Sequence, residues 1–278
     1  LGMDPGYVSG CKLAVIDENG NYLASNVIYP TKPKEDFANS SKVVLELIKK
    51  YKINSIAIGN GTASQETAAF IAKLIEEHKL DVRFAVVSEI GASVYSASKI
   101  ANLEYPNLDV TIRGAISIAQ RLRDPMAALV KIDPKSLGIG QYQHDVNQKE
   151  LNLKLENVTV DLVNKVGVDL NSASYKLLSF ISGISEKLAL NIIEHKEKIK
   201  SFKTKSELLK VKGLGAKAYE QSVGFLRIKD GLSILDNTAI HPENYDVVEK
   251  LQKILKIEEI KDEQIEQISK ELNCPILL

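Results

Sequence analysis

The spacing of apolar residues changes character about halfway along the chain. Up to about residue 134, short apolar runs typical of strands alternate with longer segments in which apolar residues recur with a helical period. Three opening runs, one ending near Met3 and the others covering 12–16 and 22–29, are separated by turn residues and predict a hairpin meander. Two later runs, 53–59 and 82–89, predict a fourth and a fifth strand. We therefore expect a five-stranded mixed sheet flanked by helices, an α/β layer architecture.

Segments of helical period follow the third, fourth and fifth runs. Ser40 or Ser41 is expected to cap a helix that ends near Tyr51, and Thr62 or Ser64 to cap the next one. The segment 91–105 predicts one helix, and 111–132 predicts a long helix interrupted at Pro125. This order would bring the strand ends at Asp4, Gly59 and Glu89 to one edge, where open α/β sheets bind ligands.

Beyond Pro134 the pattern predicts helices alone. A glycine-containing connector leads into a helix that closes at Gly167, and two amphipathic helices are expected within 241–272. We predict four units: an α/β domain over 1–134, a connector with a helix over 135–170, an all-α domain over 171–229, and a helical segment over 230–278 that starts a further domain. Because the chain starts inside a strand pattern and stops just past a helix, we expect it to be a fragment of a longer protein.

An internal repeat marks the all-α domain. The stretches "ISGIS" and "VKGLG" each follow an apolar segment and precede a helix, and their glycines, Gly183 and Gly213, are thirty residues apart. A glycine turn directly before a helix leaves N–H groups free to bind an anion such as a phosphate. A single copy could equally be an ordinary helical hairpin, but two copies in a basic region favour binding to nucleic acid. This repeat resembles the helix-hairpin-helix motif.

Contact through these turns would be made to backbone phosphates, so binding should be independent of sequence and sensitive to salt. Nearby lysines would add positive charge. The residues expected to contact nucleic acid are Gly183, Ser185, Lys187, Lys212, Gly213, Gly215 and Lys217.

The net charge of zero conceals two segments of opposite sign. Residues 171–228 hold ten Lys and one Arg against five Glu, whereas 231–278 hold five Lys against ten acids. The basic segment coincides with the repeat. The acidic segment suggests an alternative function, a surface that docks partners of a transcription complex. Solvated helix faces with a chance imbalance would give the same count.

Three carboxylates form a second candidate site. Asp4 ends the first predicted strand, Glu89 ends the fifth, and Asp124 lies in "RLRDPMAAL". In an RNase H-like sheet these acids would meet, and clustered carboxylates suit Mg²⁺ or Mn²⁺, which can activate water for phosphodiester hydrolysis. Asn60 stands at the end of a neighbouring strand and supplies no charge. Asp4 before Pro-Gly could equally be a simple turn residue.

Composition excludes several classes of protein. With 44% hydrophobic and 26% charged residues the chain has the composition of a globular protein, and no apolar run approaches the roughly 18 residues of a membrane span. Cys11 and Cys274 are far apart, which signals neither a disulfide framework nor a zinc site and fits the cytoplasm.

Long stretches of the chain resemble the bacterial Tex family of transcription accessory proteins. They include "LGMDPG", "AIGNGTASQET", "VVSEIGASVYSAS", "RGAISIAQRLRDPMAALVKIDPKSLGIGQYQHDV", "VNKVGVDLNSAS" and "HPENY". The resemblance implies a YqgF-type, RNase H-like domain followed by tandem helix-hairpin-helix units. In full-length members it also implies an N-terminal helical region and a C-terminal S1 domain. Tex-like proteins are similar to a eukaryotic elongation factor and are associated with transcription and nucleic-acid binding, without established catalysis.

Carried onto this chain, the acids of YqgF and junction-resolvase proteins fall on Asp4, Glu89 and Asp124. Resolvases carry a Glu on the strand where this chain has Asn60, which weakens the case for hydrolysis. We favour a nucleic-acid-binding scaffold that needs no cofactor for binding, and keep a Mg²⁺-dependent nuclease as the alternative. The expected partners are RNA or DNA, together with RNA polymerase or other transcription factors, and no membrane.

Overall fold

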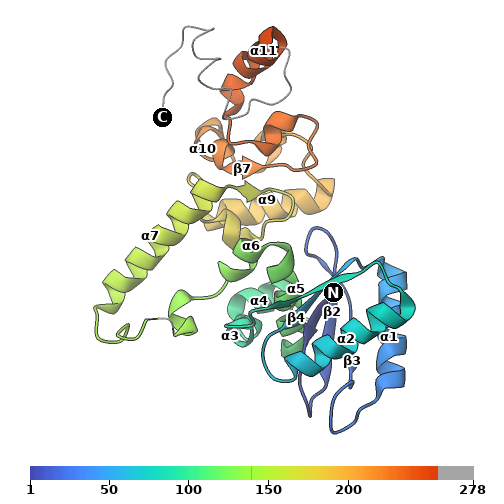
Figure 1. The fold of residues 1–278 in the computed structure, drawn as a ribbon. Coiled ribbons are helices and arrows are strands. Elements are labelled where there is room, and N and C mark those ends of the chain that lie inside the picture. The colour runs from blue at the N-terminus through green and yellow to red at the C-terminus, as the bar shows by residue number, and fades with distance from the viewer. Residues whose placement is uncertain (139, 256–278) are drawn as a thin grey trace.

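The computed structural model describes residues 1–138 and 140–255 of the chain. The second of the two predicted C-terminal helices therefore lies outside the described residues. Figure 1 shows an elongated arrangement, with the sheet and its helices at one end and the helical part stacked beyond it. Helix α7 extends sideways from the junction, and α11 lies at the far end from the sheet.

The sheet has five strands in the order β3-β2-β1-β4-β5. The strands are β1 (Gly2–Asp4), β2 (Cys11–Ile16), β3 (Tyr22–Ile28), β4 (Ser55–Gly59) and β5 (Arg83–Val87). The first three form the predicted antiparallel meander, and β1, β4 and β5 are parallel. The expectation of a five-stranded mixed sheet is confirmed. Because β1, β4 and β5 are parallel, their carboxyl ends share one edge.

Helices cover both faces of this sheet. On one face α1 (Phe37–Tyr51) and α2 (Ser64–His78) bury an apolar core that includes Met3, Ile58 and Ile71. On the other face lies α5 (Val110–Arg123), which packs on β1 and β2 around Ala14 and Ala115. A Cβ added to Gly2 would collide with the carbonyl oxygen of Ala115, so glycine is required where α5 crosses β1.

Several predicted helix boundaries were wrong because the caps were misassigned. The side chain of Asp36, not Ser40 or Ser41, caps α1 by accepting a hydrogen bond from the Asn39 amide at 3.3 Å. Helix α2 is preceded by Ala63 in a left-handed conformation, with no side-chain cap. The segment expected as one helix over 91–105 is two, α3 (Ala92–Ser96) and α4 (Lys99–Glu104), because Ser98 caps a new helix.

The junction between the two parts is made by α6 (Pro125–Leu129), which directly follows α5. Ala127 belongs to the apolar core of the helical part, and Met126 and Val130 pack against that core. A 3-10 helix, η1 (Pro134–Leu137), and the long α7 (Gln148–Val166) follow. The boundary predicted after residue 134 stays a prediction, but the core of the helical part reaches back to α6.

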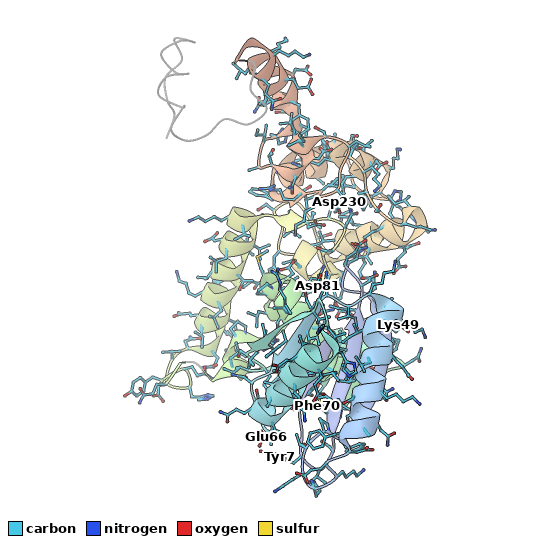
Figure 2. The ribbon with its side chains drawn as sticks, turned by 45° about the vertical axis from the view of Figure 1, so that its right-hand side comes forward. Tyr7, Lys49, Glu66, Phe70, Asp81 and Asp230 are labelled. Atoms are coloured by element: carbon cyan, nitrogen blue, oxygen red, sulfur yellow. The ribbon has the colours of Figure 1, made fainter. Side chains whose placement is uncertain are left out.

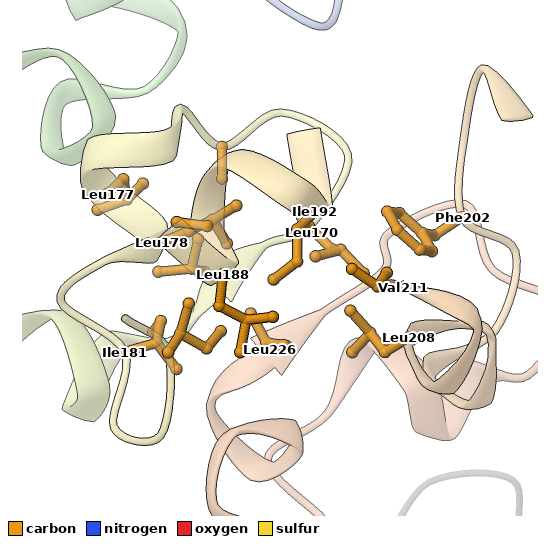
Figure 3. Packing of buried hydrophobic residues seen from close by; sticks show 14 of the residues in the cluster. Leu170, Leu177, Leu178, Ile181, Leu188, Ile192, Phe202, Leu208, Val211 and Leu226 are labelled. Carbon is orange, nitrogen blue, oxygen red and sulfur yellow. The ribbon is translucent and has the colours of Figure 1, made fainter. Parts of the chain in front are cut away.

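The helical part contains α8 (Tyr175–Leu178), α9 (Glu186–Ile199), α10 (Ala216–Ser222) and the 3-10 helices η2 (Lys205–Lys210) and η3 (Val223–Phe225). Figure 3 shows part of its core, with Leu178, Ile181 and Leu188 on one side and Leu208 beside Val211 on the other. The expectation that this part is purely helical was wrong. Two short strands, β6 (Val168–Asp169) and β7 (Leu226–Arg227), pair in parallel and tie its two ends together.

The described chain ends with the 3-10 helices η4 (Ile234–Asn237) and η5 (Pro242–Asn244) and with α11 (Tyr245–Leu255). Lys205 fixes this region to the second repeat, since its buried Nζ donates to the Thr238 carbonyl at 3.0 Å. Over the described residues, none of the helices has the length and apolar character needed to cross a membrane.

Candidate nucleic-acid interface

The two glycine turns have the same backbone geometry. Gly183 and Gly213 adopt φ values of +86° and +85°, which only glycine adopts without strain. In each turn one hydrogen bond closes the loop, from the Ile184 amide to the Ile181 carbonyl at 3.0 Å and from the Leu214 amide to the Val211 carbonyl at 3.1 Å. The pattern of buried apolar and exposed polar residues is also the same in 181–187 and 211–217. We call these segments the first turn and the second turn.

Each turn leaves backbone amides without an acceptor. Within the described residues, the amides of Gly183 and Ser185 in the first turn make no hydrogen bond. In the second turn the same holds for Lys212, Gly213 and Gly215. Each turn leads directly into a helix, α9 or α10, whose first amides also lack partners inside the helix. Exposed amides of this kind can donate to the oxygens of a phosphate.

The turns are held by reciprocal packing. Gly183 lies against Gln221 of α10, and Gly213 lies against Asn191 of α9. Since Asn191 and Gln221 are themselves thirty residues apart, each turn contacts the same position of the opposite repeat. This reciprocity is that of two units related by an approximate two-fold axis. Each turn is therefore packed against the opposite repeat.

Every residue expected to contact nucleic acid is accessible to solvent. Gly183, Ser185, Lys187, Lys212, Gly213, Gly215 and Lys217 are all exposed. Ser185 also caps α9, accepting a hydrogen bond from the Leu188 amide at 3.3 Å. At Gly215 no atom lies within 4 Å of the place a Cβ would occupy, so the space in front of that amide is open.

Two asparagines that the sequence did not predict hold the turns in place through hydrogen bonds. Asn164 of α7 donates to the Phe180 carbonyl at 2.9 Å and accepts from the Ser182 amide at 3.0 Å. Asn191 donates to the Lys212 carbonyl at 2.8 Å. In the sequence, each asparagine stands inside an amphipathic helix that precedes one of the turns, α7 for Asn164 and α9 for Asn191, and this position could have identified both.

The sheet edge brings two of the three predicted acids together. Asp4 follows Met3, which pairs with Ile58 of β4, so Asp4 reaches the level of Gly59. The carboxylate of Glu89 lies in a space left by Gly59 and Gly61, because a Cβ on either glycine would collide with it. Burial, and then the nearby Glu89 charge, raise the pKa of Asp4 to about 6.

Asn60 stands at the end of β4, as expected, whereas Asp124 does not join the other two acids. The Asn60 side chain accepts a hydrogen bond from the Glu89 amide at 3.0 Å, so it ties two loops together. Asp124 caps α6, accepting from the Ala127 amide at 3.0 Å, as its position before Pro125 suits. Helix α5 faces Asp4 with Gly114, about 15 Å along the helix from residue 124.

Two cations of the chain lie within electrostatic reach of the acids. Lys12 lies directly across the hairpin from Asp4 and favours its charged form. Arg121 is buried at 6% exposure, donates to the Ser88 carbonyl, and lies within electrostatic reach of Glu89. Burial lowers the pKa of the Arg121 guanidinium, and the Glu89 charge opposes that change. The pairing of β1 with β2, which places Lys12 opposite Asp4, could have identified Lys12 as the neighbouring cation.

This arrangement does not fit the expected metal site. Over residues 1–138 and 140–255, no three His, Cys, Asp or Glu side chains are grouped so that they could hold a metal ion. Asp4 and Glu89 meet without Asp124, and Lys12 and Arg121 supply positive charge beside them. A divalent ion of this kind favours sites with several oxygen ligands.

The loop above this edge is fixed to α2. The hydroxyl of Tyr7, in the loop 5–10, donates to the Glu66 carboxylate at 2.7 Å. Figure 2 shows the two side chains next to each other at the end of the molecule farthest from the helical part. The opposite end of the sheet, at Gly20, lines a cavity of about 680 Å³ together with Ser174 and Leu190 of the helical part. The carboxylates therefore lie at the end of the sheet domain that faces away from the helical part, and the helical part carries the glycine turns.

Comparison with known proteins matches the sheet domain and the helical part to separate family models. Residues 1–123 match the Tex protein YqgF-like domain, 163–227 match the helix-hairpin-helix motif, and 233–275 match an HHH domain. Protein tex of Bordetella pertussis is 50% identical over 252 residues, which are 90% of this chain and 32% of that protein. The chain belongs to the Tex family.

Other relatives extend the picture of the family. Uncharacterized protein YdcI of Bacillus subtilis is 48% identical over 255 residues, 92% of this chain and 36% of that protein. The human S1 RNA-binding domain-containing protein 1 is 46% identical over 231 residues, 82% of this chain and 23% of that protein. The chain thus spans about a third of the length of these bacterial Tex relatives. The resemblance to the Tex family and the predicted fold class are both confirmed.

Proposed function

We propose that this chain is the nucleic-acid-binding core of a transcription accessory factor. Its two glycine turns contact the phosphate backbone of RNA or DNA without regard to base sequence, and the RNase H-like domain serves as a scaffold. The observation that carries this proposal is the pair of matching turns with exposed amides that have no acceptor among the described residues. An exposed N–H at a helix N-terminus is a good donor to a phosphate oxygen.

The name of one relative supports a role in transcription. One relative from Neisseria gonorrhoeae, 49% identical over 257 residues, is a transcriptional accessory protein. The protein partners we propose are RNA polymerase or other transcription factors, and the location is the cytoplasm. The sheet domain is the candidate docking module, since its carboxylate edge faces away from the turns.

No hydrolytic step follows from the carboxylates. Among the described residues Asp4 and Glu89 lack the third acid of the expected set. The turns that would hold a substrate belong to the helical part, which meets the sheet domain at its opposite end. Binding through amides and lysines needs no metal ion, so we propose that the chain binds nucleic acid without a cofactor.

The test replaces two lysines of the second turn. Lys212→Glu together with Lys217→Glu should weaken binding to every sequence by about tenfold or more and flatten the salt dependence, since each lost phosphate contact lowers the slope by about 0.9. Fluorescence anisotropy with short labelled DNA duplexes and single-stranded RNA, between about 50 and 200 mM KCl, measures both quantities.

The matched control is Lys42→Glu with Lys49→Glu. Both lysines are exposed on α1 of the sheet domain, so the control changes the net charge by the same amount far from the turns. Equal losses in the two double variants, or unchanged binding when the second turn is altered, would place the binding site elsewhere.

A further inference from the structure

The two turns share a backbone but differ in charge. We infer that they contribute unequally, the second turn being the principal phosphate contact and Glu186 weakening the first. This inference rests on the proposed function, and it concerns which residues set the affinity of that same interface.

The difference between the turns lies in their side chains. The glycine φ angles, the closing hydrogen bonds and the exposure patterns are the same in both. Residues thirty apart occupy equivalent positions, so Glu186 corresponds to Ala216 and Lys187 to Lys217. Unequal affinity must therefore come from the residues that differ.

Glu186 is the first residue of α9, beside the amides that would receive a phosphate. A carboxylate there is itself stabilised by the positive end of the helix, and it repels a second anion. Lys176 holds the Glu186 carboxylate in place through an ion pair of 3.2 Å, so the charge of Lys176 is balanced by Glu186 and does not attract a phosphate. Lys187 is then the one exposed lysine of the first turn, and Glu186 adds a negative charge to the same end of the helix.

The second turn has no acid at this position. Ala216 begins α10, and both Lys212 and Lys217 are exposed. In the first turn the position of Lys212 is held by Ser182, whose amide is already bonded to Asn164. The second turn thus offers more cationic charge and one more amide without an acceptor among the described residues.

One acid does approach the second turn. Glu194 of α9 lies within electrostatic reach of Lys212. Its carboxylate is bonded to Lys198 at 2.7 Å, and that bond is the largest cause of its lowered pKa. Each of the two acids is thus paired with a lysine, but of the two it is Glu186 that stands at the first helical position, beside the amides of its turn.

The test exchanges the differing residue between the turns in the full chain. Glu186→Ala should tighten binding to a fluorescein-labelled DNA duplex by about three- to tenfold at low salt, and Ala216→Glu should weaken it by at least as much. Both substitutions are at an exposed first helical position. An acid there favours the helix by about 0.3–1 kcal/mol, so Ala216→Glu should keep the fold and Glu186→Ala should lower stability only by about that amount. Glu46→Ala, exposed on α1, is the charge-matched control and should leave affinity unchanged.

A second pair of variants compares the equivalent lysines. Lys217→Ala should weaken binding several-fold more than Lys187→Ala. Equal losses for the two lysines, or unchanged affinity in Glu186→Ala, would overturn the inference while leaving the proposed function intact. If the parent chain binds neither the duplex nor single-stranded RNA at low salt, the proposed function fails and the inference fails with it.

Discussion

Asp4 is a carboxylate in a short, largely buried strand, and the surrounding residues explain how it is tolerated. Lys12 lies across from it in the hairpin, and Gly114 leaves room for it under α5. Glu89 nearby makes a second negative charge costly, so the pKa of Asp4 is raised to about 6. An acid with this pKa is more easily protonated in the folded state than in the unfolded one.

This pKa predicts how stability depends on pH. The unfolded Asp titrates near 3.9, so between about pH 4 and pH 6 the folded state holds more protons and the free energy of unfolding falls as pH rises. Asp4→Asn removes the charge, and with it the loss of folding free energy that ionisation of Asp4 causes. The variant should be more stable than the parent by about 1–2 kcal/mol at pH 8, after allowance for solvent screening, and should gain nothing near pH 4.

Thermal melts at the two pH values measure this difference. Asp81→Asn, an exposed acid that makes no hydrogen bond or ion pair among the described residues, is the control and should show no gain at either pH. A gain in Asp4→Asn that is the same at both pH values would show that charge is not its cause.

At the scale of the elements, the repeat is fixed by the helix that precedes each turn. Asn164 makes bonds to the backbone on both sides of Ile181, whereas Asn191 makes one bond to the second turn. The first turn is therefore braced more firmly than the second. Because the Ser182 amide donates to Asn164, it is not available to donate to a phosphate.

Removing these side chains should have unequal effects on stability. Asn164→Ala leaves a carbonyl and an amide without their partners and should lower the free energy of unfolding by about 1–3 kcal/mol, whereas Asn191→Ala should cost about 1 kcal/mol or less. Denaturant unfolding of the two variants makes the comparison. A larger loss in Asn191→Ala would contradict the proposed order of bracing.

At the scale of the whole molecule, α6 joins the two parts. Asp124 ends α5 and caps α6, and Ala127 of α6 enters the core of the helical part. The sheet domain meets the helical part at its Gly20 end, while Asp4 and the loop 5–10 lie at the other. The edge that carries ligands in open α/β sheets is therefore far from the turns.

This separation predicts that binding is independent of divalent ions. Affinity for duplex DNA should be unchanged by EDTA at constant ionic strength, because amides and lysines contact phosphates directly. Loss of binding in EDTA that Mg²⁺ restores would contradict this. In the same assay we expect no cleavage of single-stranded, duplex or branched DNA or RNA with Mg²⁺ or Mn²⁺. Cleavage that disappears in Asp4→Asn would make the chain a nuclease.

The amino-acid sequence by itself determined the order of strands and helices, the repeat around Gly183 and Gly213, and the family. These features depend on local periodicity, on glycine at positive φ and on motifs that are contiguous in the chain. The order of the strands also predicted that Asp4 and Glu89 share one edge of the sheet. Only the tertiary structure decided that Asp124 caps α6 instead of joining them, and that Lys12 and Arg121 lie within electrostatic reach of the two acids. It also revealed the short β6–β7 pair, two residues per strand, which no local pattern predicts. Contacts between residues distant in the chain depend on how α5 crosses the sheet, and a crossing geometry leaves no periodic trace in the sequence.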